Sequence, residues 1–388
     1  MIHSCPTDTM TQNTFPKYFN DFRPYNENEV QEALKRLSES EIFLQSMAYF
    51  FPKKTKPELL ELLRTINSVY DFQAKIMAPV VERIIENSST GLSYQGTEHI
   101  QNEQSYIFLS NHRDIFLDAA IHQYILLTNN HKTCEITFGN NLMQNPVVAD
   151  AGKINKMFKV YRKGKPKELM EKTAQLSEYI KYAQTIKNES IWIAQRGGRT
   201  KDGNDKTQYG VLKMLCSARS GSFPEKLQKL NIIPVTVSYE FEPNDYLKVR
   251  ETLLSQNAPY KKAPNEDINS IIDGVSSHKG RINLQFGKAL NREFEEIAEL
   301  PSVNAQAKAA ATIIDKIMYS QYRLFPNNYI AADMLNNSQE YTEHYKPSQK
   351  EEFIRYMNRR LALIEFSNPE LQALFLKIYA APVYNKKN

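Results

Sequence analysis

The chain reads YIFLSNHRDIFLDAAI at residues 106–121, and this stretch decides the fold prediction. A short apolar run, typical of a buried strand, ends at Asn111-His112, and an apolar helical pattern begins a few residues later. A strand that turns directly into a helix places His112 at the edge of a sheet. The carboxylates of Asp114 and Asp118 follow within reach of the ring, as a general base requires. The alternative is an exposed loop histidine, and the downstream sequence decides between the two.

The triplet His112-Arg113-Asp114 also occurs in the catalytic loop of protein kinases. In that loop an asparagine follows the aspartate, whereas residues 115–119 of this chain read IFLDA. No glycine-rich loop with a strand lysine precedes the triplet, and no Asp-Phe-Gly follows it. The kinase interpretation is therefore excluded.

Short β-like runs alternate with helical patterns between Gly91 and about Gly287. The runs lie at residues 106–109, 136–138, 158–161, 190–194, 232–239 and 282–286. The clearest helical pattern between them covers residues 168–186. This alternation predicts an α/β fold with a mixed, largely parallel sheet flanked by helices. Binding sites in such sheets gather beyond the carboxyl ends of the strands, where His112 is expected.

The segments on either side of this region have helical patterns. The predicted organisation is a poorly ordered lead at 1–26, an N-terminal helical hairpin at 27–90, an α/β domain at 91–290 and a C-terminal helical extension at 291–388. We expect hairpin helices at 27–51 and 57–87, and a loop at 325–329. The first hairpin helix ends in an apolar patch, Met47 to Phe51, followed by lysines. This patch either dips into a membrane interface or packs on the main domain.

Composition narrows the class of protein only coarsely. With 388 residues, of which 41% are hydrophobic, the chain can bury a sizeable core. A net charge of +5 suits an anionic substrate, a membrane surface or nucleic acid equally. The three scattered cysteines predict a reducing compartment without disulfides or a metal site. No secretory signal is apparent, and no apolar stretch reaches the roughly 18–20 residues that span a bilayer. We therefore expect a cytoplasmic protein whose membrane contact, if any, is peripheral.

Three further segments follow expected strands in the same way as the histidine. Residues 158–162 read FKVYR, residues 195–199 read QRGGR, and residues 232–237 read IIPVTV. In order and approximate spacing, these segments and the histidine segment resemble the glycerolipid acyltransferases, the family of glycerol-3-phosphate and lysophosphatidate acyltransferases. The resemblance covers about residues 91–288, roughly half of the chain, and the motifs are similar to those of a bacterial branch.

The resemblance implies transfer of a fatty acyl group to a hydroxyl of a glycerol phosphate or lysolipid. The donor would be a thioester of coenzyme A or of acyl carrier protein, with no bound cofactor, no metal and no nucleic-acid partner. His112 would act as the general base, and a carboxylate would orient its ring. We expect Asp118 in that role, with Asp114 as the alternative. The implied location is peripheral, at the inner face of the cytoplasmic membrane.

The strand ends also supply candidates for binding the substrate. Arginine forks suit a phosphate group, and glycines let the backbone approach it closely. The predicted binding residues are Asn111, Arg113, Phe158, Arg162, Arg196, Gly197, Gly198 and Arg199.

Two departures from the family pattern leave alternatives open. The family has its aspartate five positions after the histidine, where this chain has Leu117. The third family motif, Pro-Glu-Gly-Thr-Arg, carries a glutamate where this chain has Gly197. The second departure predicts weakened activity or a different acceptor headgroup, so a lipid- or acyl-CoA-binding relative with impaired catalysis is the alternative function. Nucleic-acid binding is disfavoured because aromatic residues are not interleaved with the basic clusters.

Overall fold

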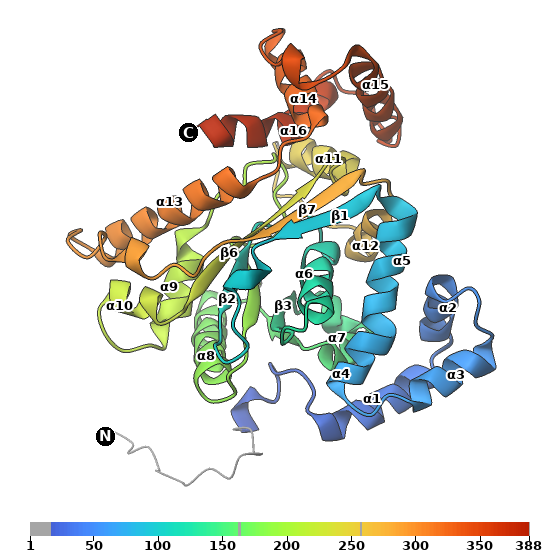
Figure 1. Ribbon diagram of the computed structural model, residues 1–388, viewed down its shortest axis with the longest axis vertical. Coiled ribbons are helices and arrows are strands. Elements are labelled where there is room, and N and C mark those ends of the chain that lie inside the picture. The colour runs from blue at the N-terminus through green and yellow to red at the C-terminus, as the bar shows by residue number, and fades with distance from the viewer. Residues whose placement is uncertain (1–16, 162–163, 257, 388) are drawn as a thin grey trace.

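A seven-stranded sheet forms the centre of the protein in a computed structural model that describes residues 17–161, 164–256 and 258–387 (Figure 1). The strand order is β1-β7-β6-β2-β5-β3-β4. Neighbouring strands are parallel except for β6 and β7, which are antiparallel. This confirms the predicted α/β class with a mixed, largely parallel sheet. The strands are β1 (Gly91–Gln95), β2 (Ile107–Ser110), β3 (Glu135–Gly139), β4 (Met157–Val160), β5 (Ile191–Ala194), β6 (Ile232–Tyr239) and β7 (Arg281–Phe286).

Helices precede, connect and follow the strands. Before the sheet lie α1 (Glu27–Ser38), α2 (Glu41–Phe50), α3 (Lys56–Arg64), α4 (Val69–Phe72), the π-helical turn η2 (Gln73–Met77) and α5 (Ala78–Ser88). Between the strands lie α6 (Leu117–Thr128), α7 (Pro146–Ile154), α8 (Pro166–Thr185), α9 (Tyr209–Ser217), α10 (Phe223–Gln228), α11 (Asp245–Ser255) and α12 (Glu266–Ser276). After the sheet come α13 (Val303–Gln321), α14 (Pro326–Asn336), α15 (Pro347–Leu361) and α16 (Leu371–Lys387). Short 3₁₀ turns are η1 (Lys17–Phe19), η3 (Thr97–His99), η4 (Leu142–Gln144), η5 (Arg292–Phe294) and η6 (Thr342–His344).

The sheet separates two hydrophobic cores. On one face, side chains of α5 and α6 pack against Phe108, Trp192 and Ile233 of the central strands. On the other face, α8, α9, α10 and α13 pack against the alternate strand residues, among them Leu109 and Ile193. The last three helices lie at the top of the molecule in Figure 1 and share a third core with α11. The central strands are therefore buried on both faces, which explains their continuous apolar sequences.

Each of the six expected β-like runs forms a strand, and β1 is the strand that sequence patterns missed. Its sequence, GLSYQ, contains no apolar run, and most of its residues are exposed at the edge of the sheet. An edge strand buries little of its surface and therefore lacks the apolar pattern of a central strand.

The N-terminal region is helical, but the two long expected helices are each broken. Residues 27–51 form α1 and α2 because Ser40 caps a new helix, its side chain accepting a hydrogen bond from the Phe43 backbone N–H. Residues 57–87 divide into α3, α4, η2 and α5. The expected loop at 325–329 is also wrong, since α14 begins at Pro326, a favourable first helical residue, and Asn328 caps the Phe325 backbone N–H.

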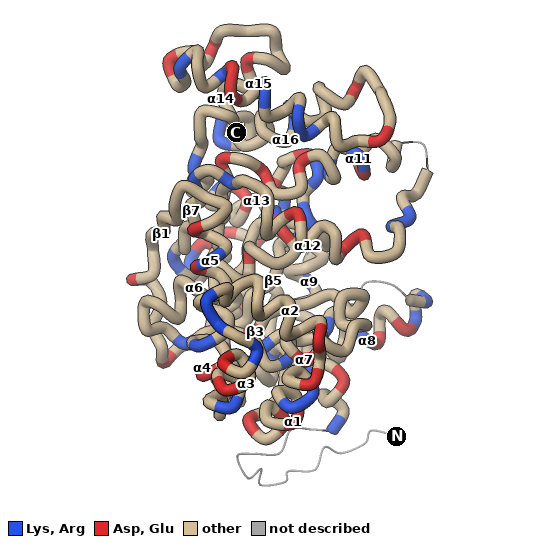
Figure 2. The backbone as a smooth tube through the Cα atoms, turned by 90° about the vertical axis from the view of Figure 1, so that its right-hand side faces the viewer, with Lys and Arg blue, Asp and Glu red and all other residues tan. Residues whose placement is uncertain are grey.

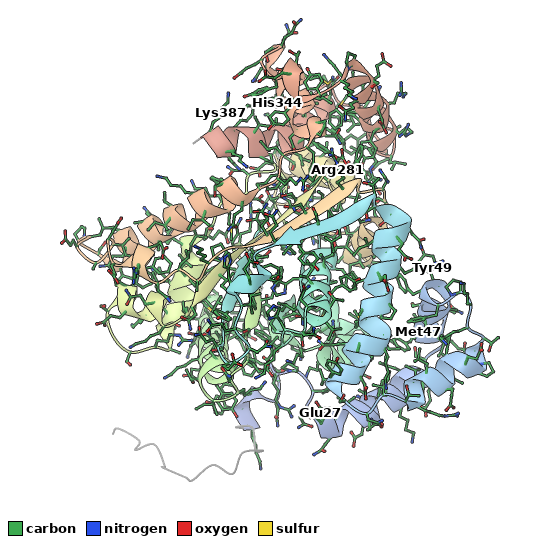
Figure 3. The ribbon with its side chains drawn as sticks, in the orientation of Figure 1. Glu27, Met47, Tyr49, Arg281, His344 and Lys387 are labelled. Carbon is green, nitrogen blue, oxygen red and sulfur yellow. The ribbon has the colours of Figure 1, made fainter. Side chains whose placement is uncertain are left out.

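The apolar patch at the end of α2 is only partly used for packing. Met47 is 3% exposed and lies in the core of the N-terminal helices, whereas Tyr49 is 62% exposed. Figure 3 labels both residues on α2, at the periphery of the molecule. Among the described residues, no helix is both long and apolar enough to cross a membrane.

Candidate active site

His112 lies two residues beyond the end of β2, at the carboxyl edge of the sheet, and is oriented by Asp118. Its ring nitrogen Nδ1 is 3.0 Å from Asp118 Oδ2. The same oxygen accepts hydrogen bonds from the backbone N–H groups of Arg113 (2.6 Å) and Asp114 (2.9 Å). The other carboxylate oxygen accepts from the Tyr239 hydroxyl at 2.9 Å. Because Asp118 is 1% exposed and held by these donors, it can hold the imidazole in one orientation.

Asp114 has a different task in the same loop. Its Oδ1 accepts from the backbone N–H groups of Phe116 and Leu117, each at 2.8 Å, and so caps the start of α6. Its Oδ2 accepts from Asn244 Nδ2 at 2.9 Å. Burial and the negative charge of Asp118 raise the pKa of Asp114. Asp118 therefore contacts the histidine, and Asp114 caps the helix. The loop accommodates the one additional residue that separates His112 from Asp118 in comparison with the family motif.

The Arg-Gly-Gly-Arg segment lies beside the histidine because β5 is the parallel neighbour of β2. The Gln195 backbone N–H donates to the Ser110 carbonyl at 2.8 Å, extending the strand pairing by one residue. Further along, the Thr200 backbone N–H donates to the His112 carbonyl at 2.9 Å. Two segments 88 positions apart in the sequence, from His112 to Thr200, are thus joined at the carboxyl edge of the sheet.

A cavity of about 80 Å³ brings His112 and Arg199 together. Its surface is apolar and polar in similar proportion, and its charged side chains lie on loops and on the start of α12. The lining residues are His112, Ile115, Phe116, Ala119, Ile136, Thr137, Phe138, Gly139, Asn141, Leu142, Met157, Trp192, Ala194, Gly198, Arg199, Lys201, Lys262 and Asp267. An apolar wall with a few convergent polar groups is the usual composition of a site for an organic ligand.

Arg199 is the buried cation of this cavity. It is 8% exposed, and its Nη2 makes one long hydrogen bond, 3.4 Å, to Ser270 Oγ. Its Nη1 is buried and has no hydrogen-bond partner within the described ranges, and no carboxylate in those ranges lies within ion-pair distance of Arg199. A buried guanidinium without a carboxylate is costly, so a bound anion would stabilise it. Arg199 can therefore recognise a negatively charged group in the cavity of His112.

Sequence reasoning missed two further cations at this cavity. Lys201 pairs with Glu251, and Lys262 pairs with Asp267. Burial lowers the pKa of Lys201, and the positive charges of Arg199 and Lys262 lower it further. Lys262 lies about sixty residues beyond the motif in sequence, so no local pattern could have indicated its position. Lys201 directly follows the motif, and that adjacency was its only signal.

Arg113, predicted as a substrate-binding residue, does not line the cavity of His112. Arg113 is 1% exposed and points away from the cavity into an ion-pair network. Its guanidinium lies 2.6 Å from Asp205 and 3.2 Å from Glu242, and Lys248 donates to its backbone carbonyl at 2.7 Å. Breaking such a buried pair is strongly destabilising because an uncompensated charge remains. Arg113 supports the histidine loop from behind.

Asn111 and Phe158, also predicted as substrate-binding residues, lie outside the lining of the cavity. Asn111 Nδ2 donates to Asp205 Oδ2 (3.0 Å) and to the Val237 carbonyl (2.9 Å), and Asn111 Oδ1 accepts from the Val237 backbone N–H. These bonds tie the histidine loop to β6. Phe158 is fully buried in the core beneath α8.

The remaining predicted residues divide between the cavity and its surroundings. Gly198 lines the cavity with a φ of +86°, a conformation that favours glycine. Arg196 lines a separate open groove together with Asp202 and Tyr209, and it is not brought to His112. Gly197 is exposed, and its backbone N–H donates to Gln208 Oε1 at 2.9 Å. Arg162 lies outside the described residues.

Replacing Gly197 by glutamate tests whether the missing family carboxylate matters. A Cβ added at Gly197 would meet only Gln208 Oε1 at 3.6 Å, an ordinary contact, and the backbone is not left-handed there. We expect Gly197→Glu to leave the melting temperature within about 2 °C and turnover within about threefold, because exposed substitutions have small effects. Gly198→Ala, strained at positive φ, is the matched comparison and should lower the melting temperature. A tenfold gain in turnover for Gly197→Glu would show instead that the lost carboxylate limits this protein.

Comparison with known proteins agrees with the motifs. Residues 91–238 match the family model described as Acyltransferase. This part of the chain is therefore similar to the acyltransferase family, as the sequence motifs predict. Among solved structures, the chain is similar to the 1-acyl-sn-glycerophosphate (LPA) acyltransferase PlsC from Thermotoga maritima, at 12% identity and a TM-score of 0.37, covering 74% of this chain and 96% of that chain. A likeness of that extent carries no information on the substrate. No curated protein gives a significant match.

Proposed function

We propose that this acyltransferase moves a fatty acyl group from an acyl thioester to a hydroxyl of a phosphate-bearing acceptor, such as a lysolipid or glycerol phosphate. The observation that carries the proposal is the shared cavity of His112, with Asp118 at its Nδ1, and Arg199, whose Nη1 has no partner among the described residues. The apolar walls suit an acyl chain, and the buried guanidinium suits a phosphate. The proposed donor is a fatty acyl thioester of either coenzyme A or acyl carrier protein.

The proposed mechanism needs one base and no covalent enzyme intermediate. His112 Nε2 accepts the proton of the acceptor hydroxyl while the oxygen attacks the thioester carbonyl carbon. The negative charge of Asp118 stabilises the imidazolium that forms. When the tetrahedral intermediate collapses, the carbon–sulfur bond breaks and the thiolate takes the proton back from the imidazolium. The products are an ester and a free thiol, and the histidine returns to its neutral form.

A peripheral position at a lipid surface is part of the proposal. An acyl acceptor with a long chain resides in a membrane, and α2 offers exposed apolar side chains, Ile42 and Tyr49, close in sequence to Lys53 and Lys54. Apolar residues beside lysines suit the interface of an anionic bilayer. Co-sedimentation with vesicles containing phosphatidylglycerol tests this part separately from catalysis.

Replacing Arg199 tests the phosphate assignment. We expect Arg199→Gln to raise the KM for a lysophosphatidate acceptor at least tenfold, because a charged hydrogen bond is worth about 1.5–3 kcal/mol. Arg196→Gln is the matched control, since Arg196 lies on the same loop but outside the cavity, and its KM should stay within twofold. The measurement is initial-rate kinetics with a labelled acyl thioester. Equal KM values for Arg199→Gln and the wild type would remove Arg199 from the acceptor site.

The same assay separates the enzyme from the alternative of a binding relative. A panel of acceptors, including glycerol phosphate, lysophosphatidate and neutral monoacylglycerol, is offered with acyl-CoA and acyl carrier protein thioesters. Transfer to a phosphate-bearing acceptor supports the proposal. Saturable binding of lysolipid or acyl-CoA without transfer to any acceptor would instead support a non-catalytic lipid-binding function.

A further inference from the structure

The mouth of the cavity is formed partly by a segment outside the family domain. Residues 258–276, here called the α12 segment, comprise the chain before α12 and α12 itself, and they follow the matched region, which ends at residue 238. Lys262 and Asp267 of this segment line the cavity, and Ser270 accepts the hydrogen bond of Arg199. Figure 2 shows basic residues on the chain that connects α11 with α12, and acidic residues where α12 begins. The family domain alone therefore does not complete the site.

Asp267 joins two sides of the cavity mouth. Its Oδ2 accepts from Asn141 Nδ2 at 2.7 Å, where Asn141 follows β3 on the opposite wall. Its Oδ1 pairs with the Lys262 ammonium. The lysine side chain is 40% exposed and the aspartate side chain 19% exposed, so the pair can exchange partners with little loss of hydration.

The charges around the cavity favour such an exchange when an anion binds. Arg199 and Lys262 are both cationic, but only Lys262 has a carboxylate of its own. A phosphate monoester at Arg199 brings one or two negative charges beside Asp267, which repels them, and near Lys262, which attracts them. A move of the ammonium from Asp267 to the phosphate satisfies both cations, while Asp267 keeps its hydrogen bond from Asn141.

We propose that Lys262 and Asp267 select for a phosphate group in the ligand bound at Arg199, with Lys262 exchanging Asp267 for that phosphate and Asp267 opposing the exchange. This inference rests on the proposed function and extends it to a lysine and a carboxylate that the family domain does not contain. The phosphate belongs either to the acceptor or to coenzyme A, and the two sources are separated by experiment.

The full chain is titrated with 1-hexanoyl-glycerol 3-phosphate in a calorimeter at low salt. We expect Lys262→Gln to weaken binding roughly fivefold, a size set by partly exposed ion pairs. Asp267→Asn should strengthen it by a similar factor, because the isosteric amide keeps the Asn141 contact but no longer competes for Lys262. Lys261→Gln, a neighbouring exposed lysine that does not line the cavity, should leave the affinity unchanged. Damage to the fold would weaken binding in both variants, so opposite changes in affinity at two residues that form an ion pair cannot result from it.

Ligands that lack a phosphate group identify which of the two substrates carries the selected phosphate. If the acceptor carries the selected phosphate, the effect of Lys262→Gln disappears with monohexanoylglycerol. If coenzyme A carries it, the effect appears with palmitoyl-CoA and disappears with palmitoyl-pantetheine. The inference is overturned if both substitutions change affinity in the same direction, if neither changes the affinity for hexanoyl-glycerol phosphate or for palmitoyl-CoA, or if Lys262→Gln acts equally on ligands with and without phosphate. Because binding is measured, these results stand apart from acyl transfer, whose absence in the wild type would refute the proposed function alone.

Discussion

His112→Ala is expected to lower acyl transfer by about 10²–10⁴-fold, the contribution typical of a positioned general base. The loss should appear in kcat, because the alanine variant keeps the apolar cavity walls and Arg199 that hold the substrates. The measurement is the initial rate with a labelled acyl thioester and the acceptor that the wild type uses best. Thermal unfolding of the same preparation shows whether the fold is intact.

The control for this variant is His344→Ala. His344 lies on η6 in the C-terminal extension, where its ring stacks on Tyr329, and it is far from His112 in the sequence (Figure 3). Its loss should leave turnover within twofold. A His112→Ala enzyme that transfers acyl groups at the wild-type rate to every acceptor would refute the base mechanism.

Asp118→Asn is expected to lower kcat by about 10³–10⁴-fold, although His112 remains in place. In the proposed mechanism, the carboxylate at 3.0 Å from Nδ1 keeps the proton on that nitrogen and stabilises the imidazolium, and a neutral amide would do neither. The amide also replaces a carboxylate that accepts two backbone N–H bonds and the Tyr239 hydroxyl, so the melting temperature should fall as well. The pH profile of kcat distinguishes the two effects, because lost stability alone does not shift its acidic limb.

Asp114→Asn is the matched comparison for Asp118→Asn. Asp114 caps α6 and contacts Asn244, so its replacement should cost about 1 kcal/mol of stability and less than tenfold in turnover. If Asp114→Asn instead abolished turnover and Asp118→Asn did not, the roles assigned to the two carboxylates would be reversed.

The strands and the class of fold could be predicted from the sequence because central strands buried on both faces have continuous apolar sequences. β1 was not predicted because an edge strand does not need a continuous apolar sequence. The breaks in the N-terminal helices were missed because Ser40 and Ser68 act as caps within otherwise continuous apolar periodicity. A cap is a local hydrogen bond that starts a new helix. The spacing of apolar residues shows which face of a helix is buried, and it does not show where one helix ends and the next begins.

The sequence by itself indicated the histidine, the two aspartates that follow it and the family that the domain resembles, since these are encoded in contiguous motifs at strand ends. Only the tertiary structure decided which aspartate meets the histidine, because that choice depends on the loop path and on Tyr239 from another strand. The structure also separated Arg199, inside the cavity, from Arg113, which is buried in ion pairs, and from Arg196, which lies in another groove. Three arginines near strand ends look alike in sequence. In the structure, the three arginine side chains point in different directions and differ in whether a carboxylate lies nearby. Both properties depend on residues that are distant along the chain.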